Sequence, residues 1–426
     1  MAIPFVYNVR NVLQRPVATA ATAIGIGLTV AVLLAAFALA EGFRTTLRAA
    51  GSPENAIVTS HGANSEVMSG FPRSAGDVLR ASPRVATGPD GRALVSLEMV
   101  ATTNLPRIGQ KGSSNLRIRG IDLATIGVRV TPVITAGRMF TPGSDEVIVG
   151  AGIAPRFEHC SVGDHIRVQK RSLKVVGLFT ANGSSYESEV WGDQNVLMPL
   201  FHRDGGWQVA LLRINRAVPL PDSARARLQA AAAHAASWSD HRPAAQRFEA
   251  LADDWRFRAL KRELEDDPRL GVEVKREDQF YAEQSVVVAT MVSVLGSFIT
   301  IIMAVGALFG AVNTMFAAVS GRTREVATLQ VLGFRGGAIL ASFVTESVII
   351  ALLGGVLGCV IALPINGITT STTNFQSFSE VAFRFRVTPQ LMVVALVFSA
   401  LLGVAGGFFP ALRAARQPIA STLRGG

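Results

Sequence analysis

Thirty-eight consecutive residues, 284–321, carry no charged side chain: QSVVVATMVSVLGSFITIIMAVGALFGAVNTMFAAVSG. An α-helix rises about 1.5 Å per residue, so this run would reach roughly 57 Å as a helix. The hydrocarbon core of a bilayer is only about 30 Å thick. We therefore expect a membrane-spanning helix that projects beyond the bilayer at one end or both, and a purely soluble enzyme is excluded.

Three other segments are similarly apolar. No charge interrupts residues 17–40 or 387–412, and only Glu346 and Glu380 fall between residues 336 and 383. Since about 20 apolar residues cross a bilayer, we predict spans at 17–40, 285–320, 338–364 and 390–410. The predicted fold is an integral membrane α-helical protein with four transmembrane helices. Residues 41–284 would form a large mixed α/β extracytoplasmic domain with stalk helices, inserted between the first and second spans.

The positive charge of the chain lies beside these spans. The whole sequence has a net charge of +10, and segments 1–16, 321–337 and 411–426 together hold eight arginines against Glu325 alone, a net of +7. Short basic segments mark the cytoplasmic side of a membrane protein. We therefore predict a multi-pass protein of the bacterial inner membrane with both termini inside, 321–337 as a cytoplasmic segment, 365–389 as an outer loop and 411–426 as a cytoplasmic tail. The same placement accounts for the basic composition without a nucleic-acid partner.

One alternative concerns the first span. Ala38, Leu39 and Ala40 resemble a signal-peptidase site, which would make this span a cleaved signal peptide. The apolar region of a signal peptide has about 7–15 residues, and this run has 24. An uncleaved anchor is the favoured interpretation.

The region between the first two spans has mixed periodicity. Strand composition occurs at 56–60, 93–100, 116–119 and 146–149, and residues 165–169 and 173–176 read as a hairpin. Residues 221–237 and 247–265 are predicted helices, and a strand at 272–275 leads back to the membrane. These elements predict a mixed α/β domain.

Signatures of catalysis are absent from the sequence. None of the five lysines follows a glycine, so the chain has no Walker A loop for ATP. His159, Cys160, Asp164 and His165 lack a zinc-ligand spacing, and no metal site is predicted. The paired acids at 253–254 and 266–267 read as solvated helix faces. We expect a non-catalytic chain without a cofactor of its own.

Two features of the apolar half suggest function. Residues 322–335, RTREVATLQVLGFR, have helical composition that stops at Gly333, with Val326, Leu329 and Leu332 or Gly333 on one stripe. That stripe could lie on lipid headgroups or dock into a partner groove, and composition leaves both open. Glu346 lies about seven residues into the third span, where a charge is either functional or paired with an arginine at the boundary.

Small residues recur four positions apart within the predicted spans. Such pairs let helix backbones approach closely, although membrane helices are rich in glycine in any case. Which pairs would form a dimer face cannot be read from the spacing. The pairs are Ala23 and Gly27, Gly306 and Gly310, Gly354 and Gly358, and Gly403 and Gly407.

An ordered set of short motifs resembles the FtsX-like ABC permeases, specifically their macrolide-exporter (MacB-like) branch. The C-terminal 140 residues resemble the membrane domain of that family, and the N-terminal half resembles its first span and periplasmic core domain. The C-terminal motifs are Asn313-Thr314-Met315, Arg324-Glu325-Val326-Ala327, Leu332-Gly333-Phe334, Glu346-Ser347 and Pro410-Ala411-Leu412-Arg413. The N-terminal motifs are Gly137-Arg138-Met139-Phe140, Val162-Gly163-Asp164, Val175-Val176-Gly177 and the stretch from Tyr186 to Asp193.

The resemblance implies the membrane subunit of an ABC exporter or mechanotransmitter. A separate ATPase subunit, which binds ATP and Mg²⁺, would grip the coupling segment at 321–337, with Arg322, Arg324, Glu325, Val326, Leu329, Leu332 and Gly333 as its contact residues. Only about 16 residues precede the first span, so we expect no fused ATPase. The other implied partners are a second copy or a related permease, the lipid bilayer, and, as further candidates, a periplasmic adaptor and an outer-membrane channel. The alternatives are a regulatory permease that controls a cell-wall hydrolase, a lipoprotein-releasing permease, and a membrane-anchored receptor without an ATPase.

Overall fold

The described part of the chain forms two compact units. The computed structural model describes residues 7, 10–12, 14–109, 111–129, 132–234, 242–374 and 377–416. A helical unit draws on segments 1–43, 289–368 and 384–426, and an α/β unit draws on 44–288 and 369–383.

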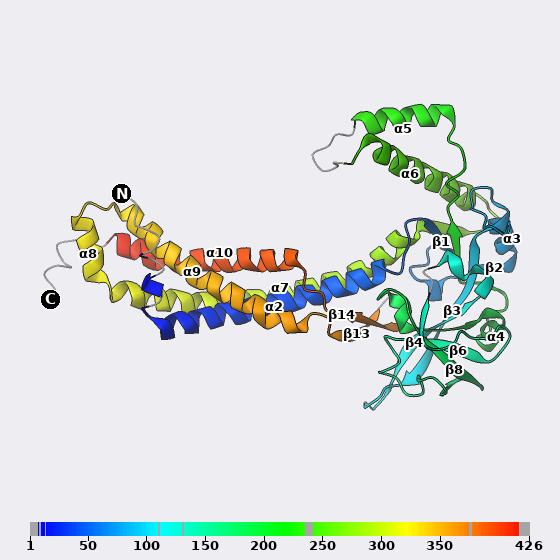
Figure 1. Cartoon of the computed structure of the whole chain (residues 1–426), viewed down its shortest axis with the longest axis horizontal. Helices are drawn as coiled ribbons and strands as arrows, with labels where there is room; N and C mark the ends of the chain where they lie inside the picture. Colours follow the sequence, from blue (N-terminus) through cyan, green and yellow to red (C-terminus); the bar gives the residue numbers. More distant parts are fainter. Residues whose placement is uncertain are drawn as a thin grey trace. The chain divides into compact units, whose positions relative to one another are not determined.

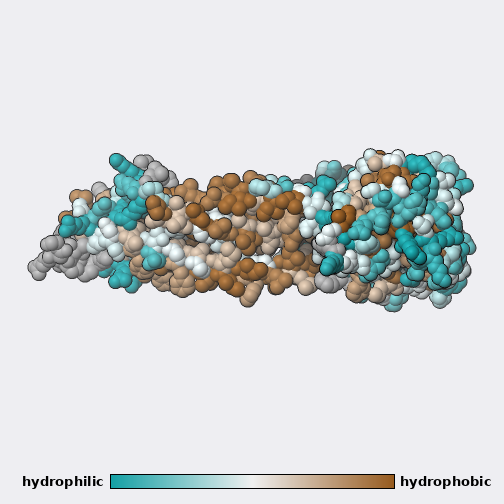
Figure 2. Space-filling view, turned by 90° about the horizontal axis from the view of Figure 1, so that it is seen from below, coloured by the Kyte–Doolittle hydropathy of each residue, from teal (hydrophilic) through white to brown (hydrophobic). Residues whose placement is uncertain are grey.

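The helical unit is built from the long apolar segments. Among the described residues, four helices are long and apolar enough to cross a membrane: α2 (Pro16–Arg48), α7 (Glu277–Ser320), α9 (Gly336–Ala362, extended by η4, Leu363–Ile365) and α10 (Pro389–Ala415). The short helix α8 (Thr323–Val331) connects α7 to α9 (Figure 1). Figure 2 shows a brown, apolar surface along these helices, with teal gathered at the end where α8 lies. This surface is what a lipid-facing helical unit requires.

Close backbone approaches hold these helices together. A Cβ at Gly354 of α9 would lie 2.6 Å from the Ala23 carbonyl oxygen, and one at Gly358 would lie 2.5 Å from the Gly27 carbonyl oxygen of α2. Glycine is therefore required at this crossing, because any side chain would push the two backbones apart. Two predicted pairs thus face each other within one chain.

The other two pairs behave differently from each other. Gly403 and Gly407 of α10 meet α9, where added Cβ atoms would lie 2.7 Å from Ala351 Cβ and 2.5 Å from Ser347 Cβ. Gly306 and Gly310 of α7 have no such neighbour, since no described atom lies within 4 Å of a Cβ built on either. Three pairs are therefore used inside the chain and one is left open.

A mixed sheet forms the centre of the α/β unit. Its ten strands among the described residues run in the order β12-β1-β11-β3-β4-β9-β6-β8-β5, and β7 pairs with β8. The pairs β4–β9 and β6–β8 are parallel and the rest are antiparallel. The strands are β1 (Asn55–Ser60), β3 (Val95–Pro106), β4 (Ser113–Ile121), β5 (Val133–Gly137), β6 (Glu146–Gly150), β7 (His165–Val168), β8 (Arg171–Thr180), β9 (Glu189–Asp193), β11 (Val209–Arg213) and β12 (Val272–Arg276).

Both faces of the sheet are covered. Ala56 and Val58 of β1 belong to one buried apolar cluster, and Ile57 between them belongs to another. The first cluster includes Phe257 of α6 (Ala244–Glu265), and the second includes Tyr281 in the first turns of α7. Alternate residues of a strand point to opposite faces, so a charged residue in a central strand such as β9, whose five residues are all buried, lies inside whichever way it points.

The remaining elements complete the α/β unit. Helices α5 (Asp222–His234) and α6 lie side by side (Figure 1). The others are α3 (Arg73–Ala81), α4 (Gln194–Leu200), the 3₁₀ helices η1 (Glu66–Met68), η2 (Leu123–Val128) and η3 (Ser185–Ser188), and the two-residue strands β2 (Phe71–Pro72) and β10 (Gly206–Trp207). The strands and helices predicted from periodicity in this region are confirmed for the described residues, and residues 235–237 of the helix predicted at 221–237 lie outside them.

The segment predicted as an outer loop contains regular secondary structure. Within 365–389 the chain forms a hairpin of β13 (Thr369–Asn374) and β14 (Ser379–Arg384). Residues 369–383 belong to the α/β unit, where Ala382 N donates to Ser188 Oγ over 2.8 Å and Glu380 pairs with Arg107 at 3.3 Å. β-Branched threonines favour a strand here although the segment lacks an apolar alternation. The α/β unit is therefore assembled from two insertions, not one.

Candidate functional site

Arg322 joins three segments at the α8 end of the helical unit. Its Nη1 donates to Glu346 Oε2 of α9 over 3.0 Å, and its Nε donates to Glu325 Oε2 of α8 over 2.9 Å. Nη2 donates to the Tyr7 hydroxyl over 2.8 Å, and the guanidinium lies over the rings of Tyr7 and Phe343 at 5.3 and 5.5 Å. A planar guanidinium with five donors suits such a junction, because it can bond and stack at once.

Glu346 is therefore held by a specific partner. Its side chain is buried within α9, and Arg322 supplies the charge that a carboxylate inside an apolar helix needs. Of the two roles left open by the sequence, pairing with an arginine is the one observed. Outside the spans, the hydrogen bond from Arg322 lowers the pKa of Glu325, so this carboxylate stays charged at neutral pH.

The inward face of α8 packs on the ends of three long helices. Val326 is 2% exposed and Ala327 is equally buried, so the Val326 side chain packs on helices of its own chain; its contact with an ATPase stays a prediction. Leu329 is half-buried and lines a small cavity beside Arg322. The buried residues around Val326 come from α7, α9 and α10, namely Met315, Ala318, Val319, Ile339, Phe343, Ala411 and Ala414. The chain itself thus buries the Val326 end of the apolar stripe, while Leu332 at the other end is 66% exposed.

The outward face of α8 presents other residues. Val331 and Leu332 are 63% and 66% exposed, and the side chains of Arg324 and Glu325 face solvent. Gly333 follows with φ +92, a left-handed conformation that ends the helix and favours glycine. The exposed patch of Arg324, Glu325, Val331 and Leu332, hereafter the outer α8 face, is what a partner would meet. Val331 was not among the predicted site residues.

A second cluster of charges lies inside the α/β unit. The buried charge cluster consists of Glu66, Glu98, Arg117, Arg119, Arg129 and Glu189, three acids and three arginines with at most 4% of each residue exposed. Arg119 is its centre, with donors at 2.7 Å from Glu189, 2.9 Å from Glu66 and 2.8 Å from Glu98. Burial alone would raise the pKa of Glu66, but the guanidiniums of Arg119 and Arg117 outweigh it and lower the pKa to about 2.

The first turns of α7 are bonded to this cluster. The Tyr281 hydroxyl donates to Glu66 Oε1 over 3.0 Å. Glu277 accepts hydrogen bonds from Asn55 Nδ2 at 2.8 Å and from the Tyr186 hydroxyl at 3.2 Å. Burial raises the pKa of Glu277, and the nearby Arg129 opposes that effect only in part. The start of α7 is thereby fixed to the sheet by polar contacts as well as by packing.

Sequence reasoning did not find this cluster. The alternation at residues 116–119 was recognised as a strand, but an arginine at every second position is also what a solvent-facing strand would show. The available signal was that β4 lies between other strands of a sheet covered on both faces, where residues 116–121 are all buried. That signal exists only once the strand order is known.

Two family models match the chain. The MacB-like periplasmic core domain matches residues 19–237, just over half of the chain, and the FtsX-like permease C-terminal domain matches residues 286–419. The two matches follow each other in the order that the motifs predicted. The first covers most of the α/β unit, and the second covers α8, α9, α10 and most of α7.

Curated relatives are similar over about a third of the chain. A macrolide export ATP-binding/permease protein MacB of Bordetella avium is 37% identical over 133 residues, which are 31% of this chain and 19% of that protein. An uncharacterised ABC transporter permease of Methanocaldococcus jannaschii is 32% identical over 141 residues, 32% of this chain and 35% of that protein. The chain thus spans between about a fifth and a third of the length of these relatives. A crystal structure of the periplasmic region of MacB from Actinobacillus actinomycetemcomitans aligns with a TM-score of 0.35 and 12% identity, over 56% of this chain and 95% of that one.

Proposed function

The chain belongs to the family of FtsX-like permeases with a MacB-like periplasmic core domain, and we propose that it is the membrane subunit of an ABC exporter. In this proposal a separate ATPase subunit binds ATP and Mg²⁺ and hydrolyses ATP in the cytoplasm. This chain transmits the resulting motion to its α/β unit on the other side of the membrane. The name of the Bordetella relative supports export as the direction of transport.

The proposed topology follows from charge. Both termini and residues 321–337 would lie in the cytoplasm and residues 41–284 outside, because the basic segments beside the spans carry a net +7. Residues 369–383 would lie outside too, since they pack within the α/β unit. A second copy or a related permease would complete the transporter, and the open face of α7 at Gly306 and Gly310 is available for that contact. A periplasmic adaptor and an outer-membrane channel are further proposed partners.

The Arg322 junction is the observation that carries the proposal. A force applied to α8 would reach α9 through the bond between Arg322 and Glu346 and through the packing of Val326 on Ile339 and Phe343. A short helix that merely lay on lipid headgroups would not need a buried charge pair behind it. The outer α8 face would then be the surface that the ATPase grips, with Leu332 and Val331 as apolar contacts and Arg324 at the rim.

The proposal is tested by purifying the tagged full chain from its own cells. The wild type should retain an ABC ATPase, identified by mass spectrometry, and the purified complex should hydrolyse ATP. The double variant Leu332→Asp with Arg324→Glu should lose both the bound ATPase and the ATP hydrolysis. A leucine buried in a partner groove contributes about 2–4 kcal/mol to docking, and a buried aspartate would oppose it.

A matched control separates docking from folding. Val133→Asp places the same charge on an exposed valine of β5 in the α/β unit, and it should retain the ATPase. Full ATP hydrolysis by the Leu332→Asp/Arg324→Glu variant, at wild-type yield in the membrane, would refute α8 as the coupling element. No contact among the described residues favours control of a cell-wall hydrolase or lipoprotein release.

A further inference from the structure

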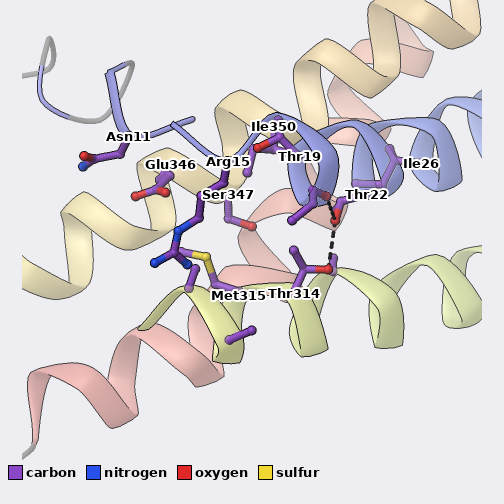
Figure 3. Close-up of a pocket in the computed structure, with 14 residues that line it drawn as sticks. Asn11, Arg15, Thr19, Thr22, Ile26, Thr314, Met315, Glu346, Ser347 and Ile350 are labelled. Atoms are coloured by element: carbon purple, nitrogen blue, oxygen red, sulfur yellow. Dashed lines mark hydrogen bonds between the residues drawn. The ribbon is translucent and has the colours of Figure 1, made fainter. Parts of the chain in front are cut away.

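A cavity of about 60 Å³ lies between α2, α7 and α9 in the helical unit. Its walls change character along its length: Figure 3 shows Asn11, Arg15 and Glu346 towards one end and Ile26 towards the other. Between them, Thr22 Oγ1 and Thr314 Oγ1 are hydrogen-bonded at 3.0 Å. The cavity is thus polar and charged at one end and apolar at the other.

The polar end holds donors that the protein itself does not use. The side chain of Arg15 makes no hydrogen bond or ion pair with any residue that the structure describes. Its main-chain oxygen accepts from Thr19 N over 3.0 Å, and its guanidinium lies beside Gly321, just after α7. Asn11 is 9% exposed, and its buried Nδ2 has no hydrogen-bond partner among those residues. A buried donor without a partner is destabilising, so a ligand that accepts hydrogen bonds here would be favoured.

The charged side chains that line the cavity indicate the sign of the charge on its ligand. Glu346 also lines the cavity, but its Oε2 is already bonded to Arg322 at 3.0 Å. Arg15 is therefore the lining charge without an ion-pair partner among the described residues, and the complementary ligand is an anion. The threonine hydroxyls donate to main-chain or neighbouring oxygens and form a wall of moderate polarity.

We propose that this cavity binds an anionic phospholipid, with the phosphate at Arg15 and Asn11 and the start of an acyl chain along Ile26 and Ile350. A free phosphate would match the polar end alone and would leave the apolar end unfilled. A lipid matches both ends, and it can enter from the surface because Ala18 at the cavity and Ile24 on the same helix are exposed. Pockets between membrane helices with a basic residue bind lipid headgroups in this manner. The proposal does not depend on an ATPase partner.

Native mass spectrometry of the detergent-solubilised full chain tests the site directly. The chain is titrated with phosphatidylglycerol and with phosphatidylcholine of identical acyl chains, and separately with glycerol 3-phosphate. We expect one phosphatidylglycerol per chain, bound roughly tenfold more tightly than phosphatidylcholine, since a charge-assisted hydrogen bond is worth about one decade of affinity or more. Glycerol 3-phosphate should bind far more weakly than either lipid.

Three variants assign the binding to this cavity. Arg15→Gln should lower the affinity for phosphatidylglycerol to that for phosphatidylcholine. Ala18→Trp keeps every charge but fills the cavity from an exposed helix position. It should therefore weaken the binding of both lipids. Arg335→Gln removes an exposed arginine that does not line the cavity, and it should bind as the wild type does.

The outcomes that overturn the proposal are equally specific. Equal binding of the two lipids by the wild type, or unchanged binding by both Arg15→Gln and Ala18→Trp, would exclude an anionic-lipid site here. Glycerol 3-phosphate bound as tightly as the lipid would make the cavity a phosphate site instead. If Arg15→Gln fails to fold, as judged by its thermal unfolding in detergent, Ala18→Trp decides alone.

Discussion

Arg119 and Arg322 each bind several acidic side chains, but their surroundings differ. The Arg119 side chain is 0% exposed, and every carboxylate around it is buried within the α/β unit. Arg322 has one buried partner, Glu346, and one partner, Glu325, whose side chain is 57% exposed. Strands and a 3₁₀ helix of a single unit supply the acids around Arg119, whereas Arg322 joins three separate helical segments.

The difference separates a fully buried ion network from a junction in which one ion pair is exposed. Displacing one member of the buried charge cluster leaves a charge unpaired in a low-dielectric interior, which is strongly unfavourable. Displacing Glu325 from Arg322 only returns an exposed carboxylate to water, which is nearly neutral. The buried charge cluster therefore resists disruption, whereas the exposed half of the Arg322 junction can exchange its partner for water at little cost.

Removal of the central arginine of the buried charge cluster should have the largest effect. Arg119→Met leaves Glu66, Glu98 and Glu189 with fewer charge partners, and we expect the α/β unit to lose about 3–5 kcal/mol of unfolding free energy. Urea unfolding of the full chain in detergent, followed by tryptophan fluorescence, measures this loss, because all four tryptophans lie between residues 191 and 255. Arg171→Met, which breaks an exposed pair with Asp145 on the same unit, should stay close to the wild type. Equal stability of the two variants would contradict a rigid, charge-locked body.

Removal of Arg322 should have a smaller effect that a second mutation relieves. Arg322→Met leaves the buried Glu346 without its partner, and we expect a loss of about 1.5–3 kcal/mol in unfolding of the helical unit by SDS. Adding Glu346→Gln removes the stranded charge, so the double variant should be more stable than Arg322→Met alone. Strictly additive losses in this double-mutant cycle would show that the two residues are not coupled.

Mild acid should have the smallest effect. The pKa of Glu66 is lowered from 4.5 to about 2, so its contribution to stability is fully present above pH 4.5 and is lost as the pH falls towards about 2. We expect urea midpoints of the α/β unit, read from tryptophan fluorescence, to show no loss attributable to this carboxylate between pH 7 and pH 4.5. A steep loss centred above pH 5 would mean that the cluster is not the stabilised ion network described here.

Much of the helical unit could be predicted from composition, because apolar length alone identifies a span and glycine at 333 ends a helix. Which residues of α8 are buried and which are exposed could not be predicted in this way. Val326 and Leu332 lie on one stripe in the sequence pattern, yet Val326 is 2% exposed and Leu332 is 66% exposed. Both a partner groove and the chain's own helices bury apolar side chains, so periodicity cannot choose between them. The hairpin at 369–384 was missed for a related reason, since its threonine-rich strand carries no apolar alternation.

The sequence by itself determined four membrane helices, a mixed α/β domain between the first two, and the order of motifs that identifies the family. Those features are local, because they depend on residues that are close together in the chain. Only the tertiary structure decided that Arg119 would meet Glu66, Glu98 and Glu189, and that Arg322 would meet Glu346. Such pairings depend on which strands become neighbours and how helices cross. Side chains far apart in sequence gain a charge partner only when the fold has brought them together and removed the water between them.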